Sequence, residues 1–369
     1  MMGYFKNPPK KKVEGIPGFD MAAPATRASA VGDVGLEIEV EGGGLPFTIG
    51  SVNGISWVPK EDGSLRGGRE YVFSSPAKIE DVPELVAKLY ESFTANGTRL
   101  ILSNRCSTHV HLNVSGWKWD KIVTLYLLWC AFESSLINWC GVNRSKNHFA
   151  LSCLDQSRNT DALLGFLSTG KLAFGEGAKY TAFNFSRLAD LGSLEVRCGN
   201  AYTTAKPIID WTLLLNGFKS YAYEVIKTPD RVPSLLSETG PAGLFNEICD
   251  LAKVGDIRDE VFAVNPDFEY QARDGIREVQ KLAYHFPWTE WEEAFNAVYV
   301  PNPFGKAKKK AAQLFADELP RDRPLFADWV LQRDTEIPAE PARLNNAMEG
   351  AIRRLREVEV IAAGRQGHR

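Results

Sequence analysis

The stretch STHVHLN, residues 107–113, alternates between two kinds of side chain with the two-residue period of a β-strand. Successive side chains of a strand point to opposite faces, so one face of this strand is polar and the other can pack. The polar face carries Ser107, His109, His111 and Asn113, whereas the packing face carries Thr108, Val110 and Leu112. This stretch therefore predicts a sheet with one buried apolar face and one face that holds two imidazoles, which can bind metal or phosphate.

Three other segments repeat this alternation and place charged groups on one face. VGLEIEVE (34–41) carries three glutamates on one side, REYVF (69–73) follows an aspartate loop, and SLEVRCG (193–199) carries a Glu-x-Arg pair. The charged residues on these faces are Glu37, Glu39, Glu41, Glu70, Glu195 and Arg197, and Asp62 lies in the loop before 69–73. We predict that the four strands contribute to one polar face.

The order of helices and strands along the chain predicts the fold class. Helical spacing over 78–96, 118–139, 159–168 and 206–226 alternates with short strands, including 54–58, 98–102 and 179–186. Hairpin-like pairs of strands favour an α+β fold with a mainly antiparallel sheet. The expected organisation is a flexible N-terminal arm (1–33), a core of strands and helices (34–226) and a mostly helical C-terminal region (227–369).

Charge and cysteine usage narrow the class of protein. The chain has 369 residues, with 43 Lys and Arg against 46 Asp and Glu, so no global charge favours nucleic acid. Six cysteines without close C-x-x-C spacing indicate reduced core residues and a cytoplasmic protein. The most apolar segment, 122–140, is interrupted by Glu133 and predicts a buried helix rather than a membrane span.

Glutamate and histidine dominate the polar face, and this composition favours a metal site. Each strand alone fits a solvated sheet face, and the Glu-x-Arg pair alone fits an ion pair worth under about 1 kcal/mol. Clustered carboxylates repel one another, and a divalent cation relieves that repulsion. Carboxylate oxygens with an imidazole suit Mg²⁺ or Mn²⁺ better than zinc. The chain has no Gly-rich Walker loop and no Rossmann fingerprint, so any nucleotide has to be held in another way.

An ordered set of segments resembles a known family. The segments are GLEIEVE, DGSL with GGREYVFSSP, STHVHLN, NRSKN, KYTAFNFSRL with GSLEVRCGNA, and a following helix that carries Trp211. In this order, over residues 34–225, they resemble the amidoligase family of the carboxylate–amine ligase superfamily, which includes glutamine synthetase and glutamate–cysteine ligase. The resemblance implies a glutamine-synthetase-like curved sheet with helices on its outer face, and ATP-dependent amide formation in a bacterial or phage-infected cytoplasm.

The resemblance also implies roles for individual residues. Metal ligands would be Glu37, Glu39, His109 and Glu195, with Mg²⁺ or Mn²⁺ as the ion. The ATP site would include His111, Arg197, Asn184 and Lys179, where some relatives have arginine at the position of Lys179. Catalytic or substrate contacts would be Arg197, Glu70, Asp62 and Arg144. The substrates would be a small-molecule or peptide carboxylate and an amine.

Two other functions fit the same residues. One is a structural or adaptor protein that keeps the fold without the chemistry, and the other is a metal-dependent hydrolase that needs no ATP. The complete set of Glu, His and Arg residues favours a catalyst over an adaptor. The C-terminal helices are candidates for a contact between copies of the chain or with a protein partner, and neither nucleic acid nor a membrane is expected as a partner.

Overall fold

The computed structural model describes residues 25–285, apart from positions 27, 142–143, 145–146, 157–158, 164–178 and 230. Most of the expected arm (1–33), the end of the expected helix 159–168 and the C-terminal region after 285 lie outside the described residues. The chain forms two compact units, Met1–Val300 and Pro301–Arg369, and all described residues belong to the first.

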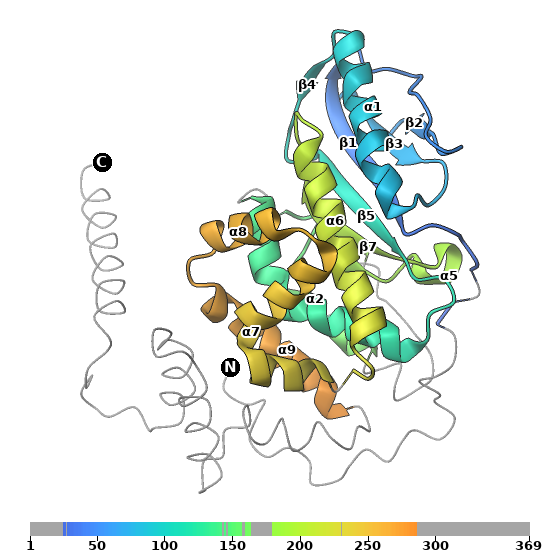
Figure 1. The fold of residues 1–369 in the computed structure, drawn as a ribbon. Coiled ribbons are helices and arrows are strands. Elements are labelled where there is room, and N and C mark those ends of the chain that lie inside the picture. Colours follow the sequence, from blue (N-terminus) through green and yellow to red (C-terminus); the bar gives the residue numbers. More distant parts are fainter. Residues whose placement is uncertain are drawn as a thin grey trace, which may run out of the picture. The chain divides into compact units, whose positions relative to one another are not determined.

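A seven-stranded sheet forms the centre of this unit (Figure 1). Its order is β2 (Trp57–Lys60), β3 (Gly68–Phe73), β1 (Val34–Gly43), β5 (Ser107–Asn113), β7 (Ser193–Asn200) and β6 (Phe183–Asn184). The remaining strand, β4 (Arg99–Ile101), pairs with the second half of β1. Every pair of neighbouring strands is antiparallel, which confirms the predicted α+β class with a mainly antiparallel sheet.

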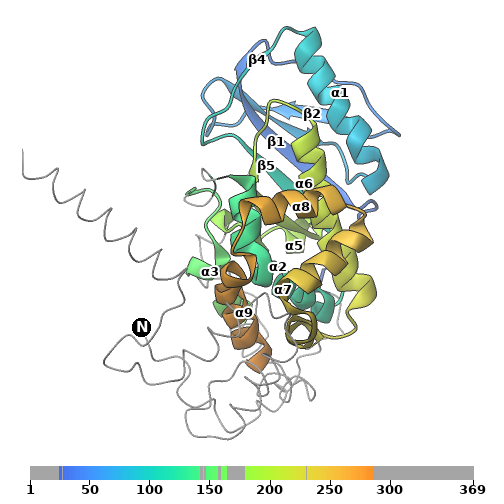
Figure 2. The same cartoon turned by 60° about the vertical axis from the view of Figure 1, so that its left-hand side comes forward.

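Helices account for most of the other described residues (Figures 1 and 2). The longer ones are α1 (Val82–Ala95), α2 (Trp119–Cys140), α6 (Lys206–Ser220), α7 (Arg231–Ala252), α8 (Gly255–Val264) and α9 (Phe268–His285). Short elements are a 3-10 turn (Ile79–Asp81), α3 (Cys153–Gln156), α5 (Leu188–Leu191) and a π-helical turn (Tyr221–Val225) that continues α6.

The apolar face of the sheet packs against α1. Leu36, Ile38 and Val40 on β1 are fully buried, as their alternation predicts. Tyr71 of β3 contacts Phe93 of α1, with ring centroids 5.4 Å apart. Each aliphatic side chain buried in this way stabilises the fold by about 1.5–3 kcal/mol, so this layer fixes which face of the sheet is covered by helices.

Two expected strands are shorter than their sequence pattern suggests. The expected strand 54–58 forms only from Trp57, and 179–186 is reduced to the two residues of β6. The backbone of 180–182 bonds to Leu151 instead: the Leu151 N–H donates to Tyr180 O (2.7 Å), and the Ala182 N–H donates to Leu151 O (2.7 Å). A loop contact distant in sequence therefore takes the hydrogen bonds that a longer strand would have used.

The apolar helix α2 lies at the centre of the helical layer. It is long and apolar enough to cross a membrane, but 83% of its most apolar window is buried inside the protein, as expected for a core helix. Phe132 of α2 contacts Phe245 of α7 and Phe268 of α9, with centroids 5.4 and 5.9 Å apart. Helices α7 and α9, which follow the expected end of the core at 226, thus pack on a helix of that core.

Replacing Gly275 of α9 with alanine is expected to destabilise the protein, although helix propensity alone predicts a gain of up to about 1 kcal/mol. A Cβ at this position would lie 1.8 Å from the carbonyl oxygen of Cys130 in α2, so the two helices would have to separate. We expect a loss of about 2 kcal/mol or more in chemical denaturation. Gly255→Ala, at the start of α8 with nothing within 4 Å, is the matched control and should be neutral or stabilising. Equal stability of both variants would contradict the close approach of α9 to α2.

Candidate metal centre

The register of the sheet brings the predicted polar residues together from five strands. Opposite partners in the ladders are Glu37 with His109, Glu39 with Glu70, His111 with Glu195, Asn184 with Glu195, and Lys60 with Glu70. Directly opposed side chains lie close enough to interact, so this register turns four separate sequence patterns into one polar surface.

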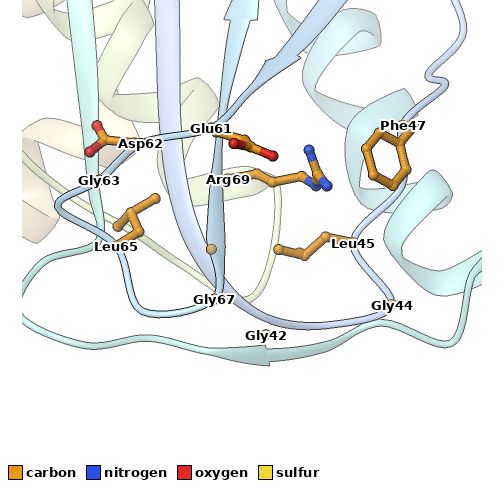
Figure 3. Close-up of a pocket in the computed structure, with 11 residues that line it drawn as sticks. Gly42, Gly44, Leu45, Phe47, Glu61, Asp62, Gly63, Leu65, Gly67 and Arg69 are labelled. Atoms are coloured by element: carbon orange, nitrogen blue, oxygen red, sulfur yellow. The ribbon is translucent and has the colours of Figure 1, made fainter.

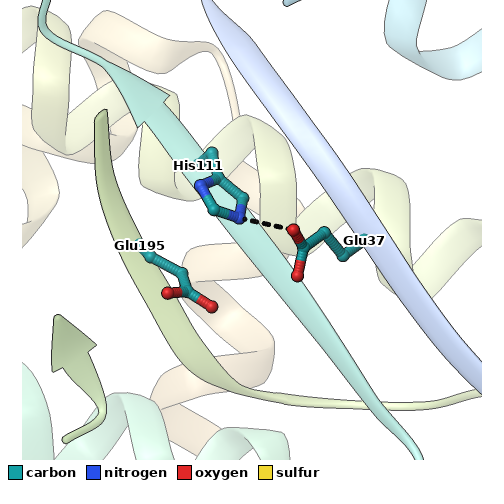
Figure 4. Close-up of side chains that lie close together, drawn as sticks. All are labelled: Glu37, His111 and Glu195. Atoms are coloured by element: carbon teal, nitrogen blue, oxygen red, sulfur yellow. Dashed lines mark ion pairs between the residues drawn. The ribbon is translucent and has the colours of Figure 1, made fainter. Parts of the chain in front are cut away.

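The first cluster consists of Glu37, His111 and Glu195 on three neighbouring strands (Figure 4). One possible ligand atom from each residue lies within 4.8 Å of the other two. His111 Nδ1 is 3.1 Å from the Ser193 hydroxyl, and Nε2 is 3.1 Å from Glu37 Oε1. This buried Nε2 has no hydrogen-bond partner other than Glu37 within the described part of the chain. A buried ring nitrogen between two carboxylates is suited to donate its lone pair to a cation.

The second cluster consists of Glu39, Asp62 and Glu70, whose carboxylate oxygens also approach within 4.8 Å of one another. Glu39 is buried on β1, Glu70 lies opposite it on β3, and Asp62 comes from the loop between β2 and β3. Burial and the negative charge of Glu37 raise the pKa of Glu70 to about 7, although Lys60 at 3.9 Å opposes this shift. The positive charge near this cluster, from Lys60, therefore does not balance the negative charge of its three carboxylates.

His109 lies between the two clusters and is almost fully buried. Its Nδ1 is 3.1 Å from Glu37 Oε2 and 3.5 Å from Glu195 Oε1. On the other side, Nε2 is 2.7 Å from the Ser107 hydroxyl, which donates a hydrogen bond to Glu39. His109, predicted as a metal ligand, thus contacts Glu37 and Glu195, and His111, predicted to bind phosphate, lies in a cluster with the same two carboxylates. Two histidines on one face of a strand are equivalent in sequence, and only the positions of the neighbouring strands distinguish them.

The imidazoles and carboxylates of the first cluster strongly affect one another's protonation. Burial acts to raise the pKa of Glu37, but hydrogen bonds and positive charge from His109 and His111 outweigh it and hold the pKa well below its usual range. Burial acts to lower the pKa of His111, yet contact with Glu37 and the charge of Glu195 raise it. The raised pKa favours the charged form of His111, whose positive charge compensates the neighbouring carboxylates.

Arg197 and Asn184 fix the orientation of Glu195. Arg197 Nη1 donates to Glu195 Oε1, and the Asn184 side-chain amide donates to Glu195 Oε2 at 2.8 Å. Arg197 Nε also donates to Phe149 O at 3.2 Å. The arginine side chain keeps 18% of its surface exposed, so the guanidinium lies at the boundary between the cluster and solvent.

A β-bulge, which the sequence pattern did not predict, determines the position of Arg197. Thr108 pairs with Gly199, but Val110 pairs with Val196, so the register of β5 and β7 shifts by one residue. Such an extra residue bends a strand and re-aims a side chain. Here both Arg197 and Cys198 lie opposite the single residue His109, which places the guanidinium beside the cluster.

Two residues predicted to contact substrate or nucleotide have other contacts in the structure. The buried Arg144 guanidinium donates to the carbonyls of Cys198 (3.1 Å), Arg197 (2.8 Å) and Cys106 (3.4 Å). Arg144 thus holds the backbone of β7 in place. Lys179 is exposed, with its ammonium 4.9 Å from the ring centroid of Tyr180. It makes no ion pair with a carboxylate in the described part of the chain, so the structure does not bring it into either cluster.

Glu133 of α2 supports the site from the core, a role that the sequence analysis missed. Its fully buried carboxylate accepts hydrogen bonds from four groups: the Trp129 indole (2.9 Å), the Ser152 hydroxyl (2.7 Å) and the backbone N–H groups of Cys153 (2.9 Å) and Leu154 (3.0 Å). These groups hold the segment that leads from Phe149, whose carbonyl binds Arg197. A glutamate inside an apolar helical run was the only sequence signal for this support.

The donor set of the two clusters fits hard divalent cations. Five carboxylates and one imidazole offer mostly oxygen ligands, which suit Mg²⁺ or Mn²⁺, and the Nε2 of His111 points toward Glu37 in the first cluster. No known protein-family model matches this chain, and no curated protein matches it. The function of the site is therefore inferred from its own geometry and chemistry.

Proposed function

We propose that the chain is an ATP- and Mg²⁺-dependent ligase that joins a carboxylate to an amine. The observation that carries this proposal is the pair of clusters, Glu37–His111–Glu195 and Glu39–Asp62–Glu70, linked by His109 and bordered by Arg197. Two adjacent cation sites beside an arginine are suited to hold a polyphosphate. The resemblance to the amidoligase family, and the glutamine-synthetase-like sheet that it implies, agree with this interpretation.

The reaction follows from the poor reactivity of a carboxylate, whose carbonyl is electron-rich and whose leaving group would be oxide. Transfer of the γ-phosphoryl group of ATP to a carboxylate oxygen gives an acyl phosphate and ADP. The amine nitrogen then attacks the acyl carbon, the C–O bond to phosphate breaks, and an amide and inorganic phosphate result. The incoming ammonium has to lose a proton first, and Asp62 or Glu70 is proposed to accept it.

The protein side chains contribute positioning and charge compensation. Divalent cations at the two clusters would neutralise charge on the phosphates, which is the main requirement of phosphoryl transfer. Arg197 is proposed to stabilise the transferred phosphoryl group from the margin of the first cluster. Asn184 and Arg197 orient Glu195, and His109 keeps both clusters at a fixed separation.

Calorimetric titration with a non-hydrolysable ATP analogue, with and without Mg²⁺, tests this function. We expect Mg²⁺-dependent binding by the wild type and its loss in Glu37→Ala and His111→Ala, followed by phosphate release in a screen of carboxylates and amines. Absence of nucleotide binding by folded protein would overturn the ligase and leave an adaptor. Turnover that needs metal but not ATP would favour the hydrolase.

The raised pKa of Glu70 predicts a dependence on pH with opposite signs for stability and for metal binding. Folding raises this pKa from 4.5 to about 7, so the folded protein keeps a proton that the unfolded chain has lost. The free energy of unfolding of the metal-free protein should therefore fall as pH rises through this window. Affinity for Mn²⁺ should rise from about pH 5.5 to about pH 8, because the bound cation requires the ionised carboxylate.

Thermal unfolding in EDTA and Mn²⁺ titration followed by electron paramagnetic resonance measure these two trends. Glu70→Gln is the control: it should weaken Mn²⁺ binding and flatten both pH profiles. A wild-type protein whose Mn²⁺ affinity is constant across this range would contradict the participation of Glu70 in a cation site.

A further inference from the structure

The Ser107 hydroxyl connects the second cluster to the imidazole between the two clusters. It donates a hydrogen bond to Glu39 and lies 2.7 Å from Nε2 of His109. Glu39 Oε2 and His109 Nε2 are themselves 3.9 Å apart, which is beyond hydrogen-bond distance, so the hydroxyl bridges a gap that these two side chains do not close. All three residues are buried, and solvent therefore competes little for these bonds.

The direction of these hydrogen bonds follows from the chemistry of the three groups. A serine hydroxyl has one hydrogen to donate and a carboxylate oxygen only accepts, so the hydrogen of Ser107 points to Glu39. The oxygen of Ser107 is left to accept, and Nε2 of His109 therefore has to donate to it. The chain of bonds runs from the His109 ring through Ser107 to Glu39, and it places a proton on Nε2.

The other ring nitrogen of His109 faces the carboxylates of the first cluster. Nδ1 lies 3.1 Å from Glu37 Oε2 and 3.5 Å from Glu195 Oε1. Three atoms with lone pairs repel one another at these distances unless positive charge lies between them. In a neutral ring that carries its proton on Nε2, the Nδ1 lone pair is available to a cation. The hydrogen bond at one nitrogen thus decides what the other nitrogen can bind.

The distances in this chain match those of a serine nucleophile, a histidine base and a carboxylate, but the proton of Ser107 is directed elsewhere. A nucleophilic serine donates its hydrogen to the histidine, whereas Ser107 donates to Glu39. Ser107 is also 2% exposed, so a substrate reaches its oxygen only if neighbouring side chains move. The geometry therefore favours a supporting role over attack on a substrate.

The second cluster borders a cavity of about 610 Å³ at the end of β1 (Figure 3). Asp62 belongs both to this cluster and to the cavity wall, which also carries Glu61 and Arg69. Asp62 projects to one side of the strand, whereas Glu61 and Arg69 project to the other (Figure 3). A ligand on the Asp62 side of the cavity lies beside the second cluster, which Ser107 links to the imidazole of the neighbouring site.

We propose that Ser107 is a positioning residue that prepares His109 to bind a cation. By accepting from Nε2 and donating to Glu39, the hydroxyl fixes both the tautomer and the orientation of the ring. The Nδ1 lone pair is thereby directed at the space between Glu37 and Glu195. This inference rests on the proposed function, because it concerns the cation sites of that ligase.

The test uses the full chain and two readouts that do not depend on turnover. Proton–nitrogen correlation NMR of isotope-labelled histidine, recorded at saturating Mg²⁺, identifies which ring nitrogen carries the proton, and His109→Asn assigns the signal. Titration with Mn²⁺, followed by electron paramagnetic resonance, measures the affinity of the first cluster. It is done in a Glu70→Gln background, in which the second cluster is weakened.

The variants separate the bridging hydroxyl from a general effect on the strand. Ser107→Ala removes the hydroxyl, and Ser107→Thr keeps one at the same position. Thr108→Val is the matched control, because Thr108 is the next residue of β5, is fully buried and donates its own hydroxyl to Asn200 O at 2.8 Å. Its side chain points to the opposite face of the strand, away from both clusters.

In the wild type we expect a single tautomer of His109, with the proton on Nε2. Ser107→Ala should weaken Mn²⁺ binding at the first cluster by about 10- to 100-fold, as is typical when a metal-binding histidine loses its hydrogen-bond partner, and it should no longer hold a single tautomer. Ser107→Thr should recover most of the affinity. Thr108→Val should match the wild type in both readouts.

A proton on Nδ1 of His109 in the Mg²⁺-saturated wild type would contradict the positioning role. Wild-type Mn²⁺ affinity in Ser107→Ala, or an equal loss in Thr108→Val, would also exclude it. Covalent labelling of Ser107 by a fluorophosphonate would identify a nucleophile instead and overturn the inference.

Failure of this inference can be distinguished from failure of the ligase function. Nucleotide binding together with unchanged Mn²⁺ affinity in Ser107→Ala removes the positioning role alone. Mn²⁺ binding that depends on Ser107, without any nucleotide binding, removes the ligase function and keeps the positioning role. Absence of Mn²⁺ binding by the wild type overturns both.

Discussion

Replacing Glu195 with glutamine is expected to weaken Mn²⁺ binding at the first cluster, and Mg²⁺-dependent nucleotide binding, by about 100-fold or more, equivalent to roughly 2.7 kcal/mol. Glu195 is 2% exposed and shares its cluster with Glu37 and His111. The substitution keeps the shape of the side chain but removes the negative charge that holds the cation. Asn184 and Arg197 each donate to one oxygen of the carboxylate. In glutamine one of these oxygens becomes an N–H₂ group, which cannot accept, so one of the two hydrogen bonds is lost.

Electron paramagnetic resonance with Mn²⁺ and calorimetry with the non-hydrolysable ATP analogue measure this effect. Glu41→Gln is the matched control, because Glu41 lies on the same polar face of β1 but binds the Arg66 N–H and belongs to neither cluster. It should bind metal and nucleotide as the wild type does. Equal affinities of Glu195→Gln and wild type would exclude the first cluster as a cation site, and an equal loss in both variants would indicate a general electrostatic effect.

The second large effect is expected from Glu133→Ala in the core of α2. Removal of this carboxylate takes the acceptor from two buried donors, the Trp129 indole and the Cys153 N–H, and one acceptor from the half-buried Ser152 and Leu154; each buried donor left unpaired costs roughly 1–3 kcal/mol. Partial rearrangement and entry of water reduce the sum, so we expect a loss of at least about 3 kcal/mol in the free energy of unfolding. Chemical denaturation followed by circular dichroism measures it.

Two comparisons show whether this loss comes from the buried hydrogen bonds. Glu91→Ala, at an exposed helical position of α1, should change stability by no more than about 0.5 kcal/mol. Ser152→Ala removes one of the four donors and should cost less than Glu133→Ala. If Glu133→Ala were as stable as Glu91→Ala, the carboxylate would not anchor the segment from Phe149 to Leu154.

Glu133 also links the core to the site through Arg197. The anchored segment supplies the Phe149 carbonyl that binds Arg197 Nε, whereas the ligands of the second cluster lie on other elements. At temperatures where Glu133→Gln remains folded, we therefore expect weaker nucleotide binding with little change in Mn²⁺ binding at the second cluster. This difference separates positioning of the arginine from general loss of structure.

The alternation within single segments made the face of each strand predictable. Leu36, Ile38 and Val40 are buried on the apolar face, and Glu37, Glu39, His109 and His111 share the polar face, because side-chain direction in a strand depends only on the local backbone. The long apolar run of α2 was predictable as a core helix for a similar reason. Local geometry is thus enough to predict the fold class and the residues that lie on the polar face.

Which side chains of the polar face contact one another was not predictable, because these contacts depend on how strands distant in sequence are paired. The register between β1, β5 and β7 sets which carboxylates lie beside each imidazole: His111 lies 3.1 Å from Glu37, and His109 lies 3.1 Å from Glu37 and 3.5 Å from Glu195. The β-bulge opposite His109 directs Arg197 toward Glu195, and no local pattern marks it. The backbone carbonyls that Arg144 binds were equally unpredictable, because they come from residues distant in sequence.

Periodicity along the chain is sufficient to predict an α+β fold with a glutamate- and histidine-rich sheet face, because two-residue and helical periods are properties of neighbouring residues. Only the tertiary structure decided which carboxylates meet, which imidazole stands between them, and that the loop between β2 and β3 closes a charged cavity beside Asp62. Those features arise from contacts between residues tens of positions apart, whose distances are set by strand register and packing rather than by local propensity.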